Sequence, residues 1–124
     1  MLNIEVINTG APKAGPYNLG IKAGNFIFIS GQVPSPEAKG IKEQTTAIFE
    51  KIKKILDTAG VNFSNLVKVS VFLKSMSDFK KMNQAYKEFF EKNGITEKFP
   101  TRTTIEATCP VSYALIEIDA IAVI

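Results

Sequence analysis

The sequence predicts an α+β fold in which a mixed sheet carries two helices on one face. Six segments have the alternating or wholly apolar pattern of strands, and two segments in the middle of the chain have the spacing of amphipathic helices. Along the chain the order is strand, strand, strand, helix, strand, helix, strand, strand. Since no linker or low-complexity segment interrupts this order, residues 1–124 are expected to form a single domain.

Three strands are expected before the first helix, at residues 2–8, 17–23 and 25–30. The Gly/Pro-rich residues 9–16 form a loop, because this composition suits neither a helix nor a central strand. Gly24 and Asn25 tolerate a positive φ and favour a tight hairpin. The third strand is apolar on both sides from Phe26 to Ile29, which is typical of a strand in the middle of a sheet.

Two amphipathic helices are predicted, with one strand between them. The first helix spans residues 42–59, where isoleucine and leucine recur at helical spacing among lysines and glutamates, and Gly60 follows in the usual position after a helix end. Residues 67–73 alternate and form the fourth strand. The second helix ends near Asn93. Its buried stripe consists of Phe79, Met82, Tyr86, Phe89 and Phe90.

Two strands close the chain, and together they suggest an anion site. Side-chain alternation places Arg102 and Thr104 on one polar face of the first strand, and Glu117 and Asp119 on one face of the last. The turn between the strands, Pro110 to Tyr113, is short enough for a hairpin. Such a hairpin would bring the guanidinium and the acidic side chains onto one sheet surface.

Composition limits the chemistry of this site. Fifteen basic residues against twelve acidic ones give a formal net charge of +3, and no basic run exceeds two residues, so the preference for anionic partners is weak. The single cysteine excludes an intramolecular disulfide, and the absence of histidine leaves no ordinary zinc cluster. We therefore expect no metal and no other cofactor.

The sequence also bears on location and assembly. Residues 1–6 lack a charged segment followed by an apolar one, and no apolar run approaches membrane-spanning length, so a soluble cytoplasmic protein is expected. Two helices cover one face of a sheet and leave the other without a partner inside the chain. Since Phe26 to Ile29 and the last strand put apolar residues on that open face, a closed homo-oligomer is predicted.

Six blocks of the sequence resemble the signature of the RidA/YjgF family, in the family's order and spacing and over nearly the whole chain. The blocks are Gly15-Pro16-Tyr17, Phe28 to Pro34, Val67 to Leu73, Asn83 with Tyr86 and Phe89-Phe90, Phe99 to Arg102, and Ile116 to Ala122. The resemblance implies a homotrimer of chorismate-mutase-like subunits with sites in the clefts between them. It also implies hydrolysis of reactive 2-imino acids, or their enamine tautomers, to 2-keto acids and ammonia, downstream of pyridoxal-phosphate enzymes.

The resemblance implies two catalytic residues. Arg102, the arginine after the Phe-Pro motif, would hold the substrate carboxylate, a task that suits its planar fork better than a lysine. Glu117 would position or activate the attacking water. An imine is already electrophilic, so orientation, one placed water and one proton-carrying carboxyl group are sufficient.

Further residues would line the pocket: Tyr17, which would close it, Ser30, Gly31 and Asn83. Family sites commonly have cysteine where this chain has Thr104. Cys109 follows several residues later on the opposite strand face and is no substitute. Since water is the attacking species, this exchange should not abolish imine hydrolysis, although it bears on the substrate range.

Other interpretations of the same residues remain open. Without the resemblance, Arg102 with Glu106 or Glu117 fits a structural ion pair on a sheet. A non-catalytic protein that binds small 2-keto acids and signals through a partner would also keep Arg102. RNA cleavage or translation inhibition, with which the family has also been linked, would call for a basic stripe with interleaved aromatics, whereas the lysines here are scattered among acids.

Overall fold

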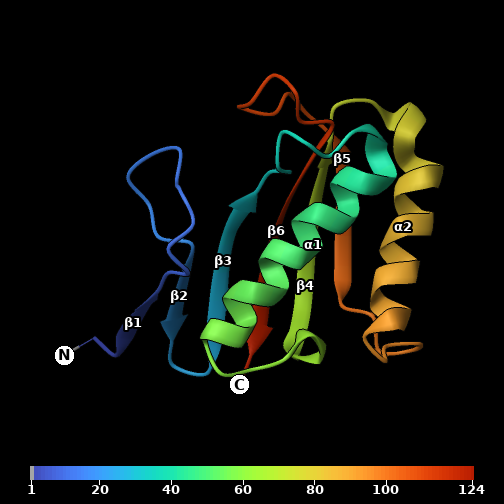
Figure 1. The fold of residues 1–124 in the computed structure, drawn as a ribbon. Helices are drawn as coiled ribbons and strands as arrows, with labels where there is room; N and C mark the ends of the chain where they lie inside the picture. The colour runs from blue at the N-terminus through green and yellow to red at the C-terminus, as the bar shows by residue number, and fades with distance from the viewer. Residues whose placement is uncertain (1) are drawn as a thin grey trace.

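The computed structural model describes residues 2–124, which form a six-stranded mixed sheet with both helices on one face (Figure 1). The strands are β1 (Ile4–Ile7), β2 (Gly20–Ala23), β3 (Phe26–Gln32), β4 (Leu66–Leu73), β5 (Thr101–Glu106) and β6 (Ile116–Val123). The helices are α1 (Gly40–Thr58) and α2 (Phe79–Lys92), with short 3-10 turns η1 (Phe63–Asn65) and η2 (Met76–Asp78). The predicted order of elements and the α+β class are confirmed.

The core lies between the sheet and the two helices. In Figure 1, α1 crosses the sheet diagonally and α2 stands beside it on the β5 side. Phe49 of α1 is fully buried, and its ring centroid lies 5.2 to 5.7 Å from those of Phe63, Tyr86, Phe89 and Phe90. Aromatic packing of this kind stabilises beyond the area it buries, so the cluster fixes α2 against α1.

The predicted hairpin between the last two strands is wrong. The sheet order is β1-β2-β3-β6-β4-β5, so β6 pairs antiparallel with both β3 and β4, while β5 pairs in parallel with β4. The crossover through α2 accounts for this pairing, because a strand that returns after a helix lies parallel to the strand before it. Residues 107–115 then carry the chain from the sheet edge back to its centre.

Side-chain chemistry agrees with these positions. In β6 the residues that face the helices, Ile116, Ile118, Ala120 and Ala122, are all buried, as a central strand requires. β5 reads Thr-Arg-Thr-Thr-Ile-Glu and buries none of its residues fully, as suits an edge strand.

The open face of the sheet is apolar over much of its area. Ile4, Val6, Phe26, Phe28 and Ile105 point away from the helices, and each is about half exposed, with Phe28 at 45% and Val6 at 57%. Exposed apolar side chains gathered on one sheet face mark an interaction surface. Within residues 2–124, neither helix combines the length and the hydropathy that a bilayer-spanning segment needs.

Candidate active site

The residues predicted for the site fall into two groups on opposite faces of the sheet. Arg102, Asn83 and Thr104 gather where α2 covers β5, and we call this group, with Tyr86, the arginine half-site. Tyr17, Ser30, Gly31 and Glu117 gather at the end of β3, and we call this group the glutamate half-site.

The strand register places the two half-sites apart. Arg102 is paired with Val69, which is fully buried on the helix-covered face. Glu117 is paired with Phe72, which faces the other way because side chains alternate along β4. One chain therefore does not bring the guanidinium and the carboxylate together, contrary to the prediction drawn from the hairpin.

Aromatic rings hold the Arg102 guanidinium in place. Its central carbon lies 4.8 Å from the ring centroid of Tyr86 and 5.7 Å from that of Phe79, and Nη1 donates to Sδ of Met82 at 4.0 Å. Among residues 2–124, no carboxylate lies within ion-pair distance of it. The half-buried guanidinium is thus oriented by cation–π contacts, and its fork is left for an anion.

Three buried polar atoms of the arginine half-site have no hydrogen-bond partner among residues 2–124. They are Oδ1 of Asn83, the hydroxyl oxygen of Tyr86 and Oγ1 of Thr104. An unsatisfied buried polar atom costs about 1–3 kcal/mol, so such a group invites a ligand or water. Burial, opposed by the charge of Arg102, raises the pKa of Tyr86 to about 12, so its hydroxyl stays protonated at neutral pH.

The sequence interpretation assigned Tyr86 to the core alone. Its ring is indeed packed against Phe49 and Phe90, with centroids 5.2 and 4.5 Å away. The same ring also serves Arg102, whose guanidinium lies over it, and the hydroxyl has no hydrogen-bond partner in the described part of the chain. The spacing of Asn83 and Tyr86, one helical turn apart, is the signal that could have revealed this role.

The glutamate half-site surrounds a cavity of about 430 Å³. Besides the four predicted residues, the lining includes Ala14, Val33, Pro110 and Val111, which the sequence did not indicate. Ser30 and Gly31 lie where the register between β3 and β6 shifts, between Ile29 and Gln32. A bulge of this kind re-aims side chains next to a site.

Hydrogen bonds fix the walls of this cavity. Oγ of Ser30 donates to the carbonyl of Asn18 at 2.6 Å, so its proton is engaged with the backbone. The Tyr17 hydroxyl accepts from the amide of Ala14 at 3.2 Å, which holds the ring against its own loop. These two residues therefore act as walls.

Glu117 lies directly over Gly31. A Cβ atom on Gly31 would come within 3.0 Å of Cδ of Glu117 and closer still to its Oε2, so only glycine leaves room for the carboxylate. Burial, followed by the negative charge of Asp119, raises the pKa of Glu117 above its ordinary value. A raised pKa makes the carboxylate a stronger base toward a water molecule.

Cys109 lies beyond the end of β5, half-buried in the following loop. Burial and the nearby charge of Glu117 raise the pKa of its thiol, while Lys74 lowers it. Cys109 thus lies near the glutamate half-site, whereas Thr104 belongs to the arginine half-site. The thiol of Cys109 therefore does not take the place of a cysteine at position 104. Within residues 2–124 there is no group of three or more His, Cys, Asp or Glu side chains that could hold a metal ion.

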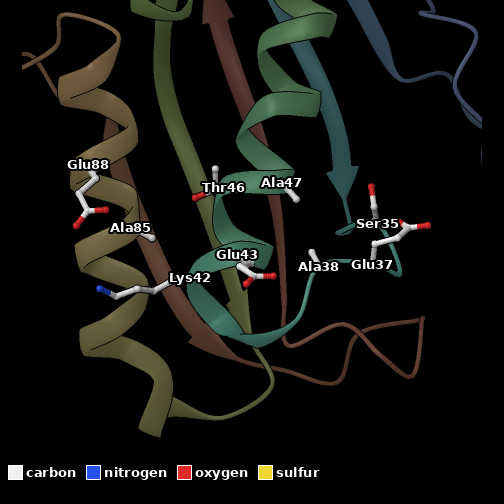
Figure 2. A pocket seen from close by; sticks show the side chains of 9 residues that line it. All are labelled: Ser35, Glu37, Ala38, Lys42, Glu43, Thr46, Ala47, Ala85 and Glu88. Carbon is white, nitrogen blue, oxygen red and sulfur yellow. The ribbon is translucent and has the colours of Figure 1, made fainter.

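Another hollow, of about 540 Å³, lies away from both half-sites, between the two helices and the loop before α1 (Figure 2). It contains no predicted site residue. Its charged side chains, Glu37, Lys42, Glu43 and Glu88, are all solvent-exposed, and none is a buried polar group awaiting a partner. We therefore regard it as solvated surface between the helices.

The structure is that of a small α+β protein built on one mixed sheet. Two helices cover one face of the sheet, the other face is open and apolar, and the polar residues form two separate half-sites. The chain belongs to the RidA/YjgF family, since the family model described as Endoribonuclease L-PSP matches residues 8–124.

Known relatives span nearly the whole chain. A RutC family protein of Pyrococcus horikoshii is 46% identical over 126 residues, covering 95% of this chain and 96% of the relative. Escherichia coli "Putative reactive intermediate deaminase TdcF" is 34% identical over 119 residues, 91% of each chain. The crystal structure of TdcF with bound serine aligns with a TM-score of 0.86 at 33% identity, covering 97% of this chain and 98% of that one. The E. coli YjgF gene product gives 0.86 at 35% identity, with 96% and 98% covered.

Replacing Gly31 with alanine should displace the Glu117 carboxylate from its position. Gly31 does not have a positive φ, so the backbone tolerates the change, and the added Cβ then forces the carboxylate toward solvent. Because burial is the main cause of its raised pKa, the pKa of Glu117 should fall, as measured by carboxyl carbon NMR titration. Gly15→Ala, whose Cβ meets only ordinary contacts with the Tyr17 ring, is the matched control. An unchanged Glu117 titration in Gly31→Ala would contradict this geometry.

Proposed function

We propose that this protein hydrolyses reactive 2-imino acids and their enamine tautomers to 2-keto acids and ammonia. The smallest substrates would be 2-iminobutanoate and 2-iminopropanoate, released by pyridoxal-phosphate enzymes. The observation that carries the proposal is the oriented guanidinium of Arg102, which lies over the Tyr86 ring and has no acidic partner among residues 2–124. Buried polar atoms of α2 and β5 also lack a partner among these residues. Membership in a family that includes TdcF, and the raised pKa of Glu117, support it.

The chemistry requires orientation and one proton carrier. Arg102 binds the carboxylate through its planar fork and so presents the C=N carbon. Glu117 accepts a proton from a water molecule as the oxygen attacks that carbon, and the protonated carboxyl group returns the proton to the nitrogen. In the resulting carbinolamine the hydroxyl proton passes to the nitrogen, with Glu117 as the proton carrier. The C–N bond then breaks as the C=O bond forms, which releases ammonia and leaves the 2-keto acid.

The two half-sites would meet between subunits of a homotrimer. In a cyclic assembly each interface joins one surface of a subunit to a different surface of the next. The apolar open face beside Glu117 supplies one such surface, and the β5 edge with Arg102 supplies the other. Each cleft would then hold Arg102 of one subunit and Glu117 of its neighbour. A monomer by light scattering at micromolar concentration would contradict this assembly.

Imine trapping tests the activity. An amino-acid oxidase acting on 2-aminobutyrate generates 2-iminobutanoate, and semicarbazide traps what is not hydrolysed. Wild-type protein should lower the semicarbazone signal, and Arg102→Ala and Glu117→Ala should each lose activity by roughly 100-fold or more, the usual contribution of a positioned catalytic group. Lys98→Ala and Glu97→Ala, which remove one exposed charge of each sign, should behave as wild type. If wild type binds 2-ketobutyrate without lowering the signal, the protein is a binder.

Complementation between inactive variants tests whether the cleft is shared. Arg102→Ala and Glu117→Ala should each be inactive alone, whereas co-expressed subunits should recover about a quarter of the wild-type rate. In a random mixture, one side of a cleft keeps Arg102 with a chance of about one half, and the other side keeps Glu117 with the same chance. The trapping assay on the purified mixture measures this recovery. If the mixture is as inactive as either variant alone, the two residues do not act across a subunit boundary.

Asp119→Asn should move the acid limb of the pH profile. Asp119 is the second cause of the raised pKa of Glu117, so its neutralisation lowers that pKa. Since ionised Glu117 is the form that accepts the proton from water, kcat/KM should persist to lower pH than in wild type. Asp57→Asn, at an exposed position on α1, is the control. A limb that stays in place or moves to higher pH would argue against Glu117 as the base.

A further inference from the structure

A second cavity adjoins the glutamate half-site. Its volume is about 530 Å³, and it lies between the loop of residues 9–17, the end of β3 and one side of α1. The two cavities share the residues Ala14, Tyr17, Gly31, Val33 and Val111. The two cavities are therefore neighbours, and a molecule in the glutamate half-site lies next to this space.

The charges that line the second cavity are mostly positive. Lys13, Lys51 and Lys54 face a single acid, Glu37. Lys13, Lys54 and Glu37 are exposed at the border, whereas Lys51 is half-buried. The excess of two positive charges favours an anionic guest, and the more buried Lys51 interacts most strongly because water screens it least.

Lys51 is held in a fixed position. Its ammonium donates to the carbonyl of Val33 at 2.7 Å, and Val33 also lines the glutamate half-site. Its other two N–H groups have no partner among residues 2–124. Burial lowers the pKa of Lys51, while the charge of Glu37 raises it, so an anion placed here would stabilise the charged form.

The proposed small substrates leave this space unused. A cavity of 300–1,000 Å³ accommodates a drug-sized ligand, and each of the two cavities falls in that range by itself. A four-carbon imino acid is much smaller. The second cavity thus fits a substrate with a longer side chain whose distal end is anionic.

We propose that the cavity around Lys51 is a subsite for the distal carboxylate of dicarboxylic 2-imino acids and of the corresponding 2-keto products. In a shared cleft the 2-imino carboxylate would bind to Arg102 of the neighbouring subunit, the side chain would pass Tyr17, and the second carboxylate would pair with the ammonium of Lys51. The identity of the reacting end rests on the proposed function, whereas the subsite itself is testable by binding.

Length-matched pairs of ligands isolate the distal carboxylate. The dissociation constants are measured by calorimetry on the intact wild-type protein, with 2-ketoglutarate compared with 2-ketopentanoate and 2-ketoadipate compared with 2-ketohexanoate. In at least one of these two pairs, the dicarboxylate should bind at least ten-fold more tightly. Lys51→Gln keeps a donor for the Val33 carbonyl but removes the charge, and should abolish most of this preference; Lys51→Arg should restore it. Lys53→Gln, on the same helix outside the cavity, should keep the wild-type ratio.

The outcomes separate this inference from the proposed function. If wild type prefers neither dicarboxylate, or if Lys51→Gln keeps the preference, the subsite is refuted even where 2-iminobutanoate is hydrolysed. If wild type hydrolyses no imine yet binds 2-ketoglutarate in a Lys51-dependent way, the subsite stands and the catalytic proposal fails. With an active protein, Lys51→Gln should lower kcat/KM for 2-iminoglutarate, generated by glutamate oxidase, relative to that for 2-iminobutanoate, whereas Lys51→Arg and Lys53→Gln should leave this ratio as in wild type.

Discussion

The central position of β6 is the constraint on which the rest of the structure depends. A strand paired on both edges must bury one row of side chains against the helices, and Ile116, Ile118, Ala120 and Ala122 form that row. Alternation then leaves Glu117 and Asp119 on the opposite face. β5 is displaced to the edge, where α2 covers Arg102 from the other side. The separation of acid and cation is therefore a consequence of sheet order.

Periodicity was sufficient to predict the elements and their inward faces. The helical stripes and the alternation in β4 and β6 depend on local geometry, which the sequence encodes directly. Strand pairing depends on distant partners, and a four-residue turn before the last strand was compatible with a hairpin that the structure does not form. The polar composition of β5 was the available clue, because a strand of threonines, an arginine and a glutamate is poorly suited to the centre of a sheet.

The candidate site was predictable only as a set of residue types. Resemblance to a family pointed to Arg102 and Glu117, and helical spacing could place Asn83 and Tyr86 on one face of α2. Neither signal indicates which polar atoms stay unpaired once α2 docks on β5. Asn83, Tyr86 and Thr104 are separated by up to 21 positions in the sequence, and their unsatisfied atoms become evident only in three dimensions. Lys51 escaped notice for a similar reason, since a lysine on an amphipathic helix ordinarily points to water.

The ring contacts around Arg102 have a consequence for ligand capture. A long cationic side chain that is paired with an acid must break that ion pair before it can bind a ligand. A cationic side chain without any contact must instead give up rotamer freedom when it binds. Phe79 and Tyr86 restrain the guanidinium without neutralising it. Much of the ordering cost is thus met during folding, so an acid that bound to Arg102, as proposed, would meet a preorganised cation. Short-lived molecules, which must be intercepted before they react elsewhere, favour a binding group of this kind.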